Sequence, residues 1–135
     1  MKEIIWTEQF SVGVEMFDEH HKEIISMFNK LASEKNATTD SEIISDTLTK
    51  MTKYAGYHFK KEEELMVKYG YPDYLRHKEL HVSYIKKTVA FCSDTMKKVD
   101  VIPDKILFYL REWWGKHILD EDMKYKEFFQ KMDVR

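Results

Sequence analysis

With 135 residues, of which 43% are hydrophobic and 34% charged, the chain is long enough for one domain with a substantial core. Its net charge of -2 argues against a protein that binds nucleic acid or an anionic membrane. Cys92 is the only cysteine, which excludes an internal disulfide and a CxxC metal site. The sequence shows no signal peptide and no apolar run of the roughly 20 residues that cross a bilayer. We therefore expect a cytoplasmic protein without membrane insertion.

The first half of the chain is predicted to contain an extended arm and two helices. Residues 1–17 form the arm, because Gly13 interrupts any helix there. Asp18 is the expected N-cap of a first helix over about 18–35, whose apolar residues recur at spacings of three and four. After a polar connector, a second helix covers about 42–69 and ends at the glycine that follows.

The second half is predicted to contain two further helices, each opened by a proline. Pro72 starts a helix over about 72–98, and Pro103 starts a helix over about 103–131, with Phe128 on its inner face. Long helices joined by short connections pack as antiparallel neighbours. We therefore predict a single all-α domain, an up-down-up-down antiparallel four-helix bundle preceded by an N-terminal extended arm.

Histidines lie on the apolar stripe of every predicted helix. The first helix carries His21, the second His58, the third His77 and His81, and the fourth His117. Because the middles of antiparallel helices lie at similar heights, these five imidazoles can converge in the core. Without a metal, clustered imidazoles would have to exclude protons or repel one another. The pattern therefore predicts a metal site rather than a set of ordinary core histidines.

A carboxylate joins this set, because Glu62 follows His58 by one helical turn on the same face. A buried salt bridge between the two is the interpretation that needs no metal. Five imidazoles and a carboxylate exceed the four ligands of a structural zinc site, which indicates two metals with Glu62 available to bridge them. Nitrogen and oxygen ligands favour iron over copper or manganese, with zinc as a further alternative.

A second bridging carboxylate is expected shortly after His117, where Asp120, Glu121 and Asp122 follow in sequence. Ideal helical geometry favours Glu121, because a fifth residue is rotated by about 140 degrees from the first. Asp122 would reach the site only through a locally widened turn, such as a π-bulge. Helical spacing alone leaves both residues open.

Taken together, these motifs resemble the hemerythrin family, and specifically its single-domain bacterial members. The resemblance covers nearly the whole chain. It is carried by segments 18–21, 58–63 and 77–81, by His117 followed by Asp122, and by the arm from Trp6 to Val14. It implies a non-haem di-iron centre with these ligands: His77, His81 and His117 on one iron, His21 and His58 on the other, and Glu62 and Asp122 as bridges.

The sequence departs from the family at His20, where the family usually has Gln before the ligand histidine. Two alternatives follow from this departure. A shift of one residue would make His20 the ligand, or His20 would contact a ligand while His21 binds the metal. The helical stripe favours His21.

The resemblance also implies a function, reversible O2 binding for carriage, storage or delivery by a protein that is not an enzyme. With a bridging oxide or hydroxide, the ligands leave one position open on the iron held by two histidines, where O2 would bind end-on as hydroperoxide. The alternatives are a di-iron oxidase or peroxidase, an O2 or redox sensor, and an iron store. We expect an unidentified reductant, an O2-accepting protein and a monomer. Candidate residues lining the O2 pocket are Phe17, Ile24, Ile25, Phe59 and Trp113.

Overall fold

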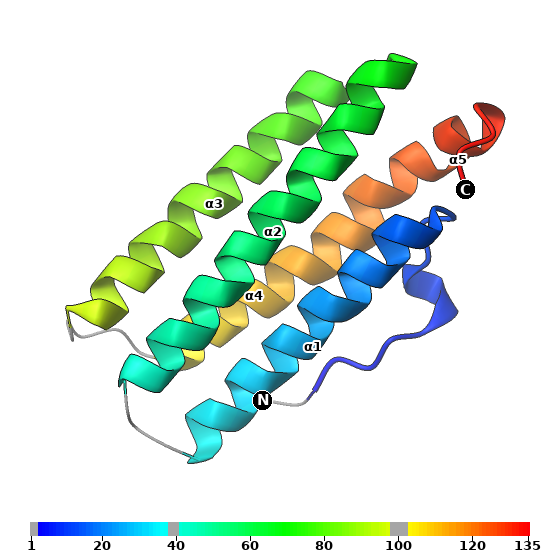
Figure 1. Ribbon diagram of the computed structural model, residues 1–135. Helices are drawn as coiled ribbons and strands as arrows, with labels where there is room; N and C mark the ends of the chain where they lie inside the picture. Colours follow the sequence, from blue (N-terminus) through cyan, green and yellow to red (C-terminus); the bar gives the residue numbers. More distant parts are fainter. Residues whose placement is uncertain (1–2, 38–40, 98–102) are drawn as a thin grey trace.

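The computed structural model describes residues 3–37, 41–97 and 103–135 (Figure 1). Its elements are η1 (Glu8–Phe10), α1 (Glu15–Ala37), α2 (Ser41–Tyr69), α3 (Tyr74–Met96), α4 (Pro103–Lys116), η2 (His117–Asp122) and α5 (Met123–Lys131). Within these ranges the secondary structure is entirely helical, and consecutive long helices run in opposite directions. The predicted all-α four-helix bundle is confirmed. The centres of both predicted connectors, 38–40 and 98–102, lie outside the described residues.

The arm runs alongside α1 and is fixed to it by paired hydrogen bonds (Figure 1). The backbone N–H of Ile4 donates to Asn29 Oδ1, and Asn29 Nδ2 donates to the carbonyl of Ile4, both at 2.9 Å. Farther along the arm, Val12 and Val14 are buried in the core. These contacts attach the arm to the bundle through both polar and apolar groups.

Asp18 does not cap α1, because the helix already begins at Glu15. Its carboxylate instead accepts hydrogen bonds from the Val12 backbone N–H at 2.8 Å and from Ser11 Oγ at 2.6 Å. A carboxylate in the first turn also interacts favourably with the partial positive charge at a helix N-terminus. Asp18 therefore joins the end of the arm to the start of α1, which spacing alone did not indicate.

The turn between α2 and α3 contains Gly70, whose φ of +70° is disfavoured for residues with a side chain. The Tyr71 backbone N–H donates to the Met66 carbonyl at 2.8 Å and so satisfies a group at the end of α2. Pro72 lies within this turn, and α3 begins at Tyr74 rather than at the proline. The turn brings α3 back beside α2 in the antiparallel sense (Figure 1).

The predicted fourth helix is interrupted by η2, a stretch of π-helix between α4 and α5. A π turn holds one residue more than an α turn, so each later residue is displaced by one position on the helix face. As a result Tyr125 and Phe129 are buried, whereas Phe128 is only half-buried at the position predicted for the inner face. The prediction for Phe128 is therefore wrong by one residue.

Large aromatic side chains fill the middle of the core, and two of them are joined by a hydrogen bond. Trp114 and Tyr84 are both buried, and Trp114 Nε1–H donates to Tyr84 Oη at 2.9 Å. A buried indole N–H needs such an acceptor, since leaving it unpaired carries the full cost of desolvation. This bond ties α3 to α4.

Replacing Tyr84 by Phe is expected to lower the free energy of unfolding by about 1–3 kcal/mol, because it leaves the Trp114 N–H buried and unpaired. Urea unfolding followed by circular dichroism measures the change. Tyr57→Phe is the matched control, since Tyr57 is half exposed. Equal stability of the Tyr84→Phe and Tyr57→Phe proteins would contradict a stabilising role for this bond.

Candidate metal centre

The structure brings all seven side chains predicted as metal ligands together in the middle of the bundle. Each is at most 3% exposed. They come from four elements: His21 on α1, His58 and Glu62 on α2, His77 and His81 on α3, and His117 and Asp122 at the two ends of η2, between α4 and α5. The donor atoms form two groups within which all distances are 4.8 Å or less: Glu62 with His77, His81 and His117, and Glu62 and Asp122 with His21 and His58.

One oxygen of each carboxylate faces the histidines of α3 and η2. Glu62 Oε1 lies 3.5 Å from His77 Nε2 and 3.3 Å from His81 Nε2. Asp122 Oδ1 lies 3.1 Å from both His77 Nε2 and His117 Nε2. Three imidazoles and two carboxylate oxygens therefore surround one point.

The other oxygen of each carboxylate faces the histidines of α1 and α2. Glu62 Oε2 lies 3.2 Å from His58 Nε2, and Asp122 Oδ2 lies 3.1 Å from His21 Nε2. The two imidazole nitrogens themselves are 3.0 Å apart. Each carboxylate thus presents one oxygen to each histidine group, which is the arrangement of a ligand that bridges two metals.

These separations match those of atoms that share a metal ion. Two donors bound at right angles about 2.1 Å from a metal lie about 3.0 Å apart. Within the described residues, Glu62 Oε1, His77 Nε2 and both Asp122 carboxylate oxygens are buried without a hydrogen-bond partner. Buried polar atoms are seldom left unpaired, so a cation bound among them accounts for the arrangement. The residues fit a pair of metal ions.

The carboxylate that reaches the cluster from η2 is Asp122, and Glu121 points elsewhere. Glu121 forms ion pairs with Arg76 and, at 3.4 Å, with Lys124 near the surface. The π turn that begins at His117 accommodates the extra residue and turns Asp122 inward. Of the two residues left open by helical spacing, only Asp122 lies at the centre.

The charges suit cation binding, because both carboxyls are held in the anionic form. Burial opposes this, but His58 beside Glu62 and His117 beside Asp122 keep the pKa of each carboxyl below its ordinary value. Burial lowers the pKa of His58 to about 4, against the opposing effect of the neighbouring Glu62. Burial also opposes charge on His77, yet the neighbouring Asp122 and Glu62 raise its pKa to about 10. A metal bound at His77 Nε2 would displace that proton.

Comparison with known proteins identifies the family and the fold. The family model described as the hemerythrin HHE cation binding domain matches residues 12–129. The chain belongs to the hemerythrin family. A bacteriohemerythrin from Methylococcus capsulatus is 36% identical over 126 residues, which cover 89% of this chain and 92% of that protein. A myohemerythrin from Theromyzon tessulatum is 32% identical over 122 residues, which cover 90% of this chain and 89% of that protein.

Solved hemerythrin structures share the fold. A crystal structure of wild-type hemerythrin superposes with a TM-score of 0.86 at 28% identity, covering 93% of this chain and 97% of that chain. Family membership and the buried His, Glu and Asp side chains together support a non-haem metal centre. No helix in the described part of the chain is long and apolar enough to cross a membrane.

Three further side chains contact the proposed metal ligands. Sequence reasoning either missed these side chains or left their role open. Tyr125 Oη donates a hydrogen bond to Glu62 Oε2. Glu63 has its Oε2 2.8 Å from His81 Nδ1. His20 lies behind His58, with the two Nδ1 atoms 2.8 Å apart, so it contacts a proposed ligand while His21 faces the carboxylates.

Aromatic rings cover the imidazoles of the candidate metal centre. Phe59 stacks on His81, with ring centroids 3.8 Å apart, and Trp113 stacks on His117 at 4.2 Å. Phe17 meets His58 edge-on at 5.9 Å. The remaining residues predicted to line an O2 pocket, Ile24 and Ile25, are buried as well.

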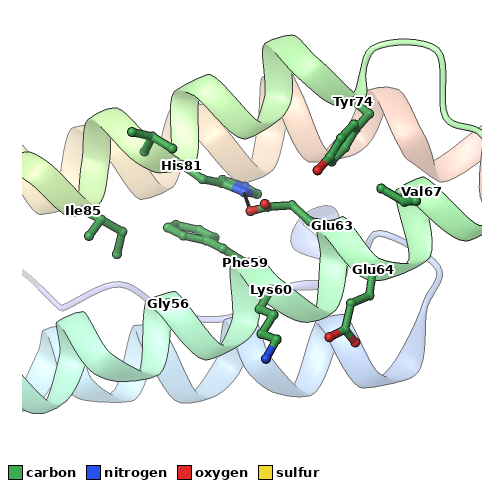
Figure 2. Close-up of a pocket in the computed structure, with 10 residues that line it drawn as sticks. Gly56, Phe59, Lys60, Glu63, Glu64, Val67, Tyr74, His81 and Ile85 are labelled. Carbon is green, nitrogen blue, oxygen red and sulfur yellow. Dashed lines mark hydrogen bonds and ion pairs between the residues drawn. The ribbon is translucent and has the colours of Figure 1, made fainter.

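A surface pocket of about 550 Å³ lies between α2 and α3, next to these rings (Figure 2). Phe59 and His81 form part of its wall, and the hydrogen bond between Glu63 and His81 lies beside them. Glu63 is half-buried, whereas the proposed ligand Glu62 next to it in sequence is completely buried. Two consecutive glutamates therefore have different surroundings, because they point to different sides of α2.

Proposed function

We propose that this member of the hemerythrin family binds O2 reversibly at two irons, for carriage, storage or delivery, and is not an enzyme. One observation above all supports the proposal: both carboxylates divide their oxygens between two groups of buried imidazoles. Two reduced irons held there would supply the electrons needed to bind O2. Family membership supports the same conclusion.

The proposed ligands follow from the distances between donor atoms. His77, His81 and His117 would hold one iron through Nε2, and His21 and His58 would hold the other. Glu62 and Asp122 would bind both. The iron with two histidines has fewer ligands from the protein, so we place the open position for end-on O2 there.

The side chains around the centre contribute by excluding water and by holding the ligands in place. Phe17 and Trp114 pack near His58, with ring centroids 5.9 and 6.3 Å away, and Phe59 packs against Trp114 at 5.6 Å. Apolar rings leave little room for water, which would otherwise assist the loss of a reduced oxygen species. Tyr125 fixes Glu62 through its hydrogen bond to Oε2.

The ligand composition favours a carrier over an oxidase. Di-iron carboxylate proteins of the ferritin type use a Glu from each of two helices and a Glu-x-x-His motif from each of the other two. Here five imidazoles surround only two carboxylates.

We also propose that an external reductant keeps the irons reduced, that a separate protein accepts the O2, and that the chain acts as a monomer.

An anaerobic titration tests the function. Reduced, iron-loaded protein is exposed to O2 while its visible absorption is followed, and the solution is then deoxygenated. We expect an absorption band that appears with O2 and disappears on its removal, with two irons per chain by metal analysis. Rapid irreversible oxidation with release of hydrogen peroxide would contradict the proposal and identify an oxidase instead.

A further inference from the structure

His58 and His81 occupy equivalent places in the two halves of the proposed centre, but their outer nitrogens face different partners. Each directs Nε2 toward the carboxylates, at 3.2 Å from Glu62 Oε2 for His58 and 3.3 Å from Glu62 Oε1 for His81. The Nδ1 atom of each ring therefore points away from the cluster. Behind His58 Nδ1 lies the imidazole of His20, and behind His81 Nδ1 lies the carboxylate of Glu63.

Metal binding at Nε2 would fix the proton of each neutral imidazole on Nδ1, because the Nε2 lone pair is then in use. His58 Nδ1–H would donate to His20 Nδ1, and His81 Nδ1–H would donate to Glu63 Oε2, each across 2.8 Å. To accept that bond, His20 must carry its own proton on Nε2. Each outer partner thereby fixes both the tautomer and the ring orientation of one ligand.

The two acceptors differ in charge, and this difference should affect how strongly each imidazole binds its metal. A carboxylate that accepts a hydrogen bond from a ligand imidazole raises the basicity of that ligand and strengthens its bond to the metal. A neutral imidazole that accepts such a hydrogen bond raises the basicity of the ligand by a smaller amount. The iron position at His77, His81 and His117 therefore has both the additional imidazole and the anionic outer partner.

The structure also fixes the two outer partners firmly. His20 is 7% exposed and lies between Tyr54 and Tyr57, with ring centroids 5.9 and 5.4 Å away. Glu63 is held on α2 at the wall of the surface pocket, where Figure 2 shows its carboxylate directed at His81. His20 cannot leave His58 without losing these ring contacts, and Glu63 cannot leave His81 without breaking its hydrogen bond.

We propose that His20 and Glu63 are positioning residues that make the two metal positions unequal, with the tighter position at His77, His81 and His117. The inference rests on the proposed di-iron function but concerns residues outside the ligand set. It also gives a role to His20, the position where this chain departs from the family pattern.

The test is a titration of the metal-free protein with Co(II) in competition with a chelator, under argon. We expect two Co(II) per chain with different affinities in the wild-type protein. Glu63→Gln should weaken the tighter position by about tenfold, because its amide oxygen can keep the hydrogen bond but lacks the negative charge. His20→Leu removes the acceptor altogether and should weaken the other position by about 10- to 100-fold. His20→Gln should stay within a few-fold of wild type, because its amide oxygen can accept the same hydrogen bond.

Proton NMR of the Co(II) protein separates positioning from a general structural effect. Each ligand Nδ1–H gives an exchangeable signal shifted by the metal, and His20→Leu should change the His58 signal alone. Glu64→Gln is the matched control for Glu63→Gln, since Glu64 is an exposed neighbour on the same helix. Circular dichroism verifies that each variant is folded.

The outcomes distinguish this inference from the proposed function. Wild-type protein that binds fewer than two Co(II) would contradict both. Two Co(II) in the wild type, with unchanged affinities and unchanged NMR signals in Glu63→Gln and His20→Leu, would overturn only the roles of His20 and Glu63. Two Co(II) bound with equal affinity by the wild type would overturn the inequality of the two positions. Equal weakening of both positions by each variant would overturn the assignment of Glu63 to one position and of His20 to the other.

Discussion

The Glu62→Gln protein is expected to lose both irons. Its iron content should fall from two per chain to well below one. Among the described residues, Glu62 is the carboxylate that belongs to both groups of donor atoms, and it lies within a regular α-helix. An amide removes the negative charge and leaves one oxygen where two are needed, so the two histidine groups no longer share this ligand. Metal analysis after anaerobic loading with Fe(II) measures the loss, and the visible absorption on O2 exposure should disappear with it.

The matched control for this change is Glu64→Gln, two residues along the same helix. Glu64 is exposed, and its carboxylate lies 3.9 Å from Lys61 Nζ at the surface. Its removal should leave two irons per chain and leave O2 binding unchanged. Two irons retained by the Glu62→Gln protein would remove Glu62 from the ligand set and with it the proposed bridging arrangement.

The second large effect is expected at the end of the π turn, where two neighbouring acidic residues should behave in opposite ways. Asp122→Asn removes the buried carboxylate whose oxygens lie 3.1 Å from His21, His77 and His117. We expect iron binding to weaken by at least about tenfold and to lose its two-metal stoichiometry. The measurement is the number of irons retained after dialysis against a chelator.

Glu121→Gln provides the comparison, because it changes the adjacent carboxylate and leaves the π turn in place. Glu121 contacts Arg76 and Lys124 near the surface, and ion pairs of this kind contribute at most about 1 kcal/mol. This protein should keep both irons and lose little stability. Loss of iron from Glu121→Gln together with retention by Asp122→Asn would show that the helix is regular here and that the ligand assignment is wrong.

The sequence was informative wherever the decisive contact lies within one regular helix. His58 and Glu62, and likewise His77 and His81, are four residues apart, and in an unbroken α-helix this spacing places both side chains on one face. The all-α bundle could be predicted for the same reason, since apolar periodicity and a few turn residues describe each helix locally. Imidazoles at matched depths on antiparallel helices then indicated a shared site.

Helical periodicity failed where the helix itself is irregular. After His117 the regular geometry favours Glu121, and only the resemblance to the hemerythrin family pointed to Asp122. The π turn that moves Asp122 inward also places Phe129 rather than Phe128 in the core. No residue type in this stretch marks a π turn, because it depends on packing against the other helices.

The sequence by itself determined the helices, their order and the histidine-rich composition of the centre, because these depend on spacings along single helices. The tertiary structure decided how the groups meet: that Glu62 and Asp122 each face two sets of imidazoles, that Tyr125 holds Glu62, and that His20 and Glu63 contact His58 and His81. Those contacts join residues on different helices or neighbours that point to different sides of one helix. Their geometry depends on how the helices are rotated and packed, which spacing along the chain does not specify.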